Sequence, residues 1–165
     1  VPGEWAGRPG TLPGYRLRVS AAAERRGGTV VVRLLGVAAV TVPGDPSAAD
    51  VVAAPRPGRS ALVVESSCLV RLARDRAGEL TRQPITHGWA DWVDGWAVDP
   101  GTADPGTADP PPGGVFRTAW ETTRTGRDRR LDLASPPVPA AAGGTVRVRV
   151  FDPLGGRWDT ICRIS

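Results

Sequence analysis

Five arginines gathered in one stretch are the residues with the clearest capacity for chemistry. They are Arg117, Arg124, Arg127, Arg129 and Arg130, and subtracting Glu121 and Asp128 leaves the stretch a formal charge of +3. A guanidinium group holds a phosphate through two parallel hydrogen bonds, so the cluster favours contact with a nucleic-acid backbone. The same side chains could instead pair with the acidic residues that precede them, and the sequence leaves both alternatives open.

Acidic residues dominate the stretch just before this cluster. Between residues 91 and 116 there is no basic residue, and the five acidic ones are Asp91, Asp94, Asp99, Asp104 and Asp109. Paired carboxylates can serve in acid–base catalysis, but this needs a cleft that shifts their pKa values. Their spacing also matches no EF-hand loop. We therefore expect solvated carboxylates in turns.

Tryptophans give the same region a second candidate surface. The aromatic candidates are Trp89, Trp92, Trp96 and Trp120. The spacing of the first three would line one face of a short helix, whereas Trp96 alternates with Val98 as in a strand. A helical turn leading into a strand reconciles both patterns. Trp120 and the nearby Phe116 could stack on bases or pack inward.

Motifs for catalysis or metal binding are missing from the sequence. It has neither a phosphate-binding loop of the GxxxxGK[ST] type nor a GxSxG elbow, and its one histidine, His87, has no Cys or Ser partner nearby. Cys68 and Cys162 lie far apart and form no CxxC pair, so we expect no zinc site. A disulfide between them is possible, but two buried free thiols fit their apolar surroundings better. We expect a chain that is not an enzyme and holds no cofactor.

Composition predicts an all-β protein. The 165 residues include 21 Gly and 17 Pro, a proportion that suits short strands joined by turns rather than long helices. Alternation and β-branched content predict strands, and a bulge or bend is expected at Gly36 because glycine packs no side chain. The expected strands are residues 15–20, 29–42, 60–65, 68–73, 79–83, 115–124, 131–134, 145–151 and 157–164.

These elements predict two small β modules. Residues 1–14 are expected to be a linker, 15–84 a β-meander module and 85–165 an antiparallel β-sandwich with one short helical turn in its Trp-rich segment. A tandem Gly-Thr-Ala-Asp-Pro repeat at 101–105 and 106–110 predicts a mobile loop.

The charge balance bears on partners and location. All 21 basic residues are arginine, the formal net charge is +4 and the pI is about 10.3. Such a balance suits a polyanionic partner such as nucleic acid, or simply a soluble surface. The longest apolar run, residues 29–42, is too short for a membrane span and contains Arg33. With no signal peptide in view, we expect a soluble cytoplasmic protein without membrane contact.

A set of residues over the last eighty positions carries a family resemblance. They are Ile85-Thr86, Trp89, Asp91-Trp92-Val93-Asp94, Trp96-Ala97-Val98-Asp99, Phe116, Trp120, Arg124, Asp128-Arg129, Leu131, Val146, Val148, Val150, Asp152, Gly155 and Asp159-Thr160. In order and rough spacing this set resembles the C-terminal region of bacterial adenine-specific DNA methyltransferases of restriction-modification type. The repeat after Asp99, and Gly144 where the family has a tyrosine, depart from that pattern, so one packing anchor is lost.

The resemblance implies a fold and a role. It implies a sandwich of the polycystic-kidney-disease (PKD) or immunoglobulin-like type that serves as a non-catalytic accessory region for DNA or subunit contacts. Its partners would be DNA, bound weakly, or a methyltransferase catalytic domain, and S-adenosylmethionine would bind that domain. Two other readings are a generic module that binds protein or carbohydrate through exposed tryptophans, and a structural spacer with every tryptophan in its core.

Overall fold

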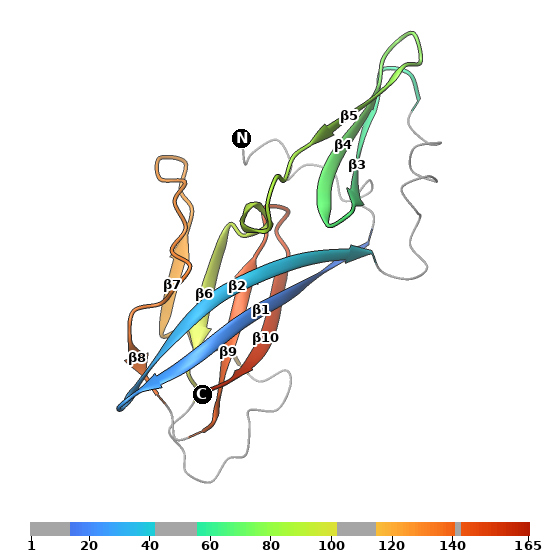
Figure 1. Cartoon of the computed structure of the whole chain (residues 1–165). Helices are drawn as coiled ribbons and strands as arrows, with labels where there is room; N and C mark the ends of the chain where they lie inside the picture. The colour runs from blue at the N-terminus through green and yellow to red at the C-terminus, as the bar shows by residue number, and fades with distance from the viewer. Residues whose placement is uncertain (1–13, 42–55, 102–114, 141–142) are drawn as a thin grey trace. The chain divides into compact units, whose positions relative to one another are not determined.

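The computed structural model describes residues 14–41, 56–101, 115–140 and 143–165 (Figure 1). These residues form ten strands in three antiparallel sheets and one short 3-10 turn, so the predicted all-β fold class is confirmed. No helix in these four ranges has the length and apolar character needed to cross a bilayer. The chain divides into two compact units, and each is described by itself.

The first unit comprises Val1–Arg18 and Val37–Trp92 and is built on a β-meander. Its sheet has the order β3 (Ser60–Glu65), β4 (Cys68–Arg74) and β5 (Leu80–Pro84). Val63 lies opposite Val70, and both are buried together with Leu72. The meander of two hairpins expected from the sequence is therefore present.

The turn between β3 and β4 is fixed from two sides within this unit. Ser66 and Ser67 adopt left-handed backbone angles, with φ of 49° and 64°. Ser67 Oγ accepts a hydrogen bond from the Ala39 amide at 2.8 Å, and the Ser67 carbonyl accepts one from Trp92 Nε1 at 2.8 Å. Such angles are costly for residues other than glycine, and these contacts hold the turn in place.

The second unit comprises Val19–Gly36 and Val93–Ser165 and contains a four-stranded sheet. The strand order is β10 (Arg157–Arg163), β9 (Thr145–Phe151), β6 (Gly95–Asp99) and β7 (Trp120–Thr123). As the alternation predicts, Val146, Val148 and Val150 of β9 are buried. β6 follows the 3-10 turn Trp89–Trp92, which confirms the expected helical turn leading into a strand.

The second unit also contains the larger part of another sheet, through Val19–Gly36 and β8. β2 (Thr29–Thr41) lies between β1 (Tyr15–Arg26) and the short β8 (Val138–Pro139), and Gly27, with φ of 62°, lies in the turn that joins β1 to β2. Ala23 of β1 forms a parallel bridge with Ile164, and the Ser165 amide donates to the Ala23 carbonyl at 2.9 Å. The interior is formed by fully buried side chains from both sheets, among them Val30, Val32, Trp96, Val98 and Val148.

The long β2 strand changes its buried face at Gly36. Before this glycine the even-numbered Val32 and Leu34 are buried and Arg33 is exposed, whereas after it Val37 and Ala39 are buried. In β1 the odd positions stay the more buried ones throughout. A one-residue shift on one strand of a hairpin is the pattern of a β-bulge, which agrees with the irregularity predicted at Gly36.

Two predicted strands are wrong in extent. Residues 115–124 form a strand only over Trp120–Thr123, and residues 131–134 contribute a single bridge between Ala134 and Arg33. The residues that precede Trp120 are held by side chains instead, as described below. The pairing of Val138–Pro139 with β2 was not predicted, because prolines flank Val138.

The domain ranges 1–14, 15–84 and 85–165 remain a sequence-based prediction. The compact units interleave along the chain, because the β1–β2 hairpin contributes to both. The two Gly-Thr-Ala-Asp-Pro repeats lie outside the described residues apart from Gly101, as does most of the expected linker.

A close backbone approach joins β6 to β7 at Gly95. A Cβ at this position would lie 2.6 Å from Thr123 Cγ2 and 2.8 Å from the Thr122 carbonyl oxygen. Only glycine fits this contact without movement of the backbone. The contact fixes β7, and with it the start of the arginine-rich segment that follows.

Candidate functional site

The predicted arginines lie mainly in one turn that follows β7. We call residues 124–130 the arginine turn. Thr125 and Asp128 close it, since the Thr125 amide donates to the Asp128 carbonyl at 2.8 Å and the Asp128 amide donates to Thr125 Oγ1 at 2.9 Å. Arg124 Nη1 donates to the Arg129 carbonyl at 3.1 Å, and the Arg124 amide donates to the Asp94 carbonyl at 2.7 Å. The sheet therefore holds the base of the turn.

Most of the guanidinium groups of this turn face solvent. Arg127, Arg129 and Arg130 are exposed, and the Arg130 side chain is 90% exposed. Arg130 approaches Asp128 at 3.4 Å, an exposed contact of little energy. The turn holds four arginines and one aspartate, a formal charge of +3. Among the described residues, no carboxylate forms an ion pair with Arg127 or Arg129.

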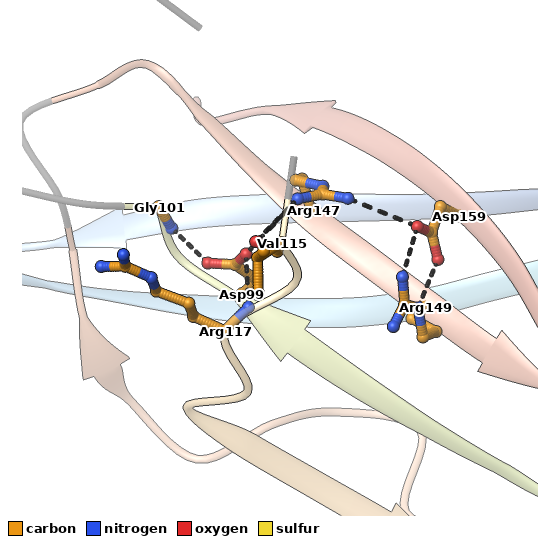
Figure 2. A network of polar contacts seen from close by, with 7 residues as sticks. All are labelled: Asp99, Gly101, Val115, Arg117, Arg147, Arg149 and Asp159. Carbon is orange, nitrogen blue, oxygen red and sulfur yellow. Dashed lines mark hydrogen bonds and ion pairs between the residues drawn. The ribbon is translucent and has the colours of Figure 1, made fainter. Parts of the chain in front are cut away.

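Arg117 lies apart from the turn, in the segment that precedes β7. Its backbone amide donates to Asp99 Oδ2 at 3.0 Å, while its side chain is exposed. Figure 2 shows its guanidinium group directed away from the Asp99 carboxylate. Among the described residues, the Arg117 guanidinium thus forms no ion pair with the preceding acidic stretch, which was one of the two alternatives left open by the sequence.

The four candidate aromatic residues serve mainly the interior. Trp92 and Trp96 are 1% and 0% exposed. Trp96 donates its indole N–H to the Asp132 carbonyl at 2.7 Å, and its ring meets that of Trp120 edge-on with 4.8 Å between centroids. Trp89 is half-buried at the start of the 3-10 turn. Trp92 and Trp96 therefore offer no surface to a ligand.

A buried ion pair lies where the sequence predicts solvated carboxylates. Asp99 is buried, and its carboxylate accepts hydrogen bonds from the Gly101 amide at 2.9 Å and the Arg117 amide at 3.0 Å (Figure 2). Arg147 Nη1 approaches Asp99 Oδ2 at 3.8 Å and donates to the Val115 carbonyl at 3.3 Å. The expectation for Asp99 is thus wrong, because its carboxylate is buried and meets two backbone amides and Arg147 rather than solvent.

A second ion pair extends this network along β9 and β10. Arg149 donates two hydrogen bonds to Asp159, at 2.7 Å and 2.8 Å, and Asp159 also meets Arg147 at 3.4 Å (Figure 2). The hydrogen bond from Arg149 is the main cause that lowers the pKa of Asp159, and the same bond raises the pKa of Arg149. Phe116 lies beneath both guanidinium groups, 4.4 Å from Arg149 and 5.4 Å from Arg147.

This network was missed because alternation describes only which face of a strand a residue occupies. Arg147 and Arg149 do lie on the face of β9 opposite its buried valines, but Arg147 is buried there all the same. The available signal was the pairing of β9 with β10, which places Asp159 opposite Arg149.

We expect Asp159 to make stability depend on pH in the acid range. Its pKa is lowered in the folded state, so the stabilisation is present above the unfolded carboxyl value of about 4 and is lost as the pH falls through the folded pKa. The difference in free energy of unfolding between the wild type and Asp159→Asn should therefore be largest near neutral pH and shrink in acid. Urea titrations across this pH range measure it, and a difference that stays constant with pH would contradict the assignment.

The remaining polar candidates are structural. Asp91 Oδ2 accepts hydrogen bonds from the amides of His87 and Gly88, at 2.7 Å and 3.2 Å, so it closes the start of the 3-10 turn. No group of three metal-ligating side chains is found within the described ranges. Cys68 and Cys162 are free thiols, but only Cys162 is buried as expected, and this burial raises its pKa, whereas Cys68 is half-buried.

Comparison of the chain with protein-family models, with curated proteins and with solved structures finds no match. Function therefore has to be inferred from the residues themselves. The arginine turn is the feature that stands out, because it combines a fixed backbone with exposed positive charge, and no carboxylate of the described residues forms an ion pair with its Arg127 or Arg129.

Proposed function

We propose that this chain is a non-catalytic β-sandwich module, of the PKD or immunoglobulin-like type, that supports DNA contacts in the cytoplasm. It would act as an accessory region of an adenine-specific DNA methyltransferase or as a stand-alone relative of one. The arginine turn and Arg117 would bind backbone phosphates. The resemblance over residues 85–165 supports the link to DNA modification, and the exposed guanidinium groups support the contact itself.

The single observation that carries this proposal is the exposed charge of the arginine turn. Phosphate binding needs guanidinium groups that keep their donors available, and Arg127 and Arg129 form no ion pair with the described residues. The buried pair of Arg147 with Asp99 and the partly exposed pair of Arg149 with Asp159 show the opposite case, in which carboxylates meet the guanidinium groups. The turn is thus suited to an anion that comes from outside the chain.

The test is DNA affinity as a function of salt concentration. Each phosphate neutralised on a duplex changes the slope of log K against log salt by about 0.9. Replacing Arg127, Arg129 and Arg130 with alanine should therefore reduce the steepness of that slope by about 2 to 3 and weaken binding at low salt. Fluorescence anisotropy with a labelled duplex gives both quantities.

A charge-matched variant makes the test specific. Arg56, Arg59 and Arg76 are also exposed but belong to the first unit, so replacing all three with alanine removes the same charge elsewhere. This control should keep most of the slope. Equal losses in both triple variants would mean that general charge, not the arginine turn, attracts DNA, and undetectable binding at low salt would refute the proposal.

The alternative of a module that binds carbohydrate or protein through exposed tryptophans receives little support from Trp92 and Trp96, since both are buried. Titration followed by tryptophan fluorescence separates the two functions. A shift with glycans and none with DNA would favour the alternative.

A further inference from the structure

The structure points to the part of a nucleic acid that the arginine turn contacts. We propose that it binds the phosphodiester backbone alone and reads no bases, an inference that rests on the proposed function. The partner would then be any nucleic acid whose phosphates are accessible, whatever its sequence. Three features favour this: the aromatic residues near the turn are engaged in other contacts, the side chains that read adenine are missing from the turn, and no ion pair with the described residues holds Arg127 or Arg129 in one geometry.

The aromatic rings nearest in sequence to the turn are already engaged. A single-stranded nucleic acid binds best where its bases stack on accessible aromatic side chains. Trp120 is in edge-on contact with the buried Trp96, and Phe116 lies under the guanidinium groups of Arg147 and Arg149. Both rings are partly buried, and each already takes part in a contact within the second unit, so neither is a fully accessible platform for a base.

The side chains that read adenine are also missing. Adenine is read mainly by Asn or Gln, through two hydrogen bonds to one base. The sequence contains no asparagine, and its single glutamine, Gln83, belongs to β5 in the first unit. The arginine turn itself consists of arginine, threonine, glycine and aspartate.

Guanine is the base that arginine reads best, through two hydrogen bonds from one guanidinium group. Base recognition requires a side chain held in one geometry, because a planar pair of hydrogen bonds has little tolerance. Arg127 and Arg129 receive no ion pair from the described residues that would fix them, and Arg130 is 90% exposed. Exposed guanidinium groups on a fixed backbone suit phosphates, whose oxygens accept hydrogen bonds from many directions.

The decisive experiment compares polymers that share phosphates but differ in bases. Labelled duplexes of only A·T pairs and only G·C pairs, and a single strand, are titrated with the full chain at several salt concentrations. We expect the two duplexes to bind within about threefold of each other and with the same salt slope, since one base-reading arginine would discriminate by about fivefold or more. Inorganic polyphosphate, which has no bases, should compete with both.

The other outcomes separate this inference from the proposed function. A preference of about fivefold or more for the G·C duplex, lost in the triple variant of Arg127, Arg129 and Arg130, would overturn the inference and leave DNA binding intact. So would tighter binding of the single strand accompanied by quenching of tryptophan fluorescence. No binding to any polymer at low salt would refute both.

Discussion

Replacing Asp99 with alanine is expected to cost about 3–5 kcal/mol of folding stability, because it removes one of the two carboxylates that meet the buried Arg147 guanidinium and the acceptor of two backbone amides. The Asp99 and Arg147 side chains are 5% and 8% exposed, so water cannot replace the lost carboxylate. The Gly101 and Arg117 amides would lose their acceptor as well. Urea denaturation of wild type and variant measures the change.

An exposed pair supplies the matched control. Glu24 and Arg26 meet at 3.4 Å with both side chains 55% exposed, so Glu24→Ala should change stability by about 0–1 kcal/mol. A double variant, Asp99→Ala with Arg147→Leu, should recover part of the loss, since it removes the buried guanidinium that has lost its buried carboxylate and keeps only the half-exposed Asp159. If Asp99→Ala were no more damaging than Glu24→Ala, the pair would not be buried in solution.

The elements that sequence predicted well are those whose signal is local. Thr145–Phe151 alternates valine with arginine, and its strand has the predicted bounds. Ser60–Glu65 is likewise recovered, because the Ser66-Ser67 pair that follows it ends the strand in a tight turn. In both cases neighbouring residues determine the conformation.

The strand predictions that were wrong concern segments whose conformation depends on residues far away in sequence. Residues 115–119 are rich enough in apolar side chains to predict a strand. The backbone hydrogen bonds between this segment and β6 nevertheless begin only at Ala119, whose amide donates to the Val98 carbonyl. Before it, Asp99 and Arg147 bind the backbone of Arg117 and Val115. Side-chain acceptors thus replace strand pairing, and no periodicity records this.

The residues of the candidate site also fall into those whose exposure the sequence could predict and those for which it could not. The exposure of Arg127, Arg129 and Arg130 could be anticipated, since charges that follow a short strand belong to a turn. The burial of Trp92 and Trp96 could not be anticipated, because an indole serves equally as a core residue or as a contact surface. Only their hydrogen bonds to the carbonyls of Ser67 and Asp132 decide between the two.

Trp96→Ala is the second change with a large expected effect, about 3–5 kcal/mol of folding stability. Trp96 is fully buried, packs edge-on against Trp120 and donates its N–H to the Asp132 carbonyl. Removing it leaves a cavity, a carbonyl without its donor and half of an aromatic pair. Thermal unfolding followed by circular dichroism measures the loss. Ile161→Ala is the control, because it truncates a side chain of the same unit that is 51% exposed. It should cost less than about 1 kcal/mol, whereas truncation of a buried aliphatic side chain costs about 2–5 kcal/mol.

Trp96→Phe separates the packing of the ring from its hydrogen bond. Phenylalanine keeps most of the apolar contact but leaves the Asp132 carbonyl without its donor, so a smaller loss of about 1–3 kcal/mol is expected. Asp132 comes two residues after Arg130, and the next carbonyl, of Leu133, accepts from Leu34 in β2. Amide exchange near the Arg33–Ala134 bridge should therefore quicken in Trp96→Phe while exchange in β9 stays slow. Unchanged exchange at the bridge would mean that the β2 hydrogen bonds alone anchor the segment after the arginine turn.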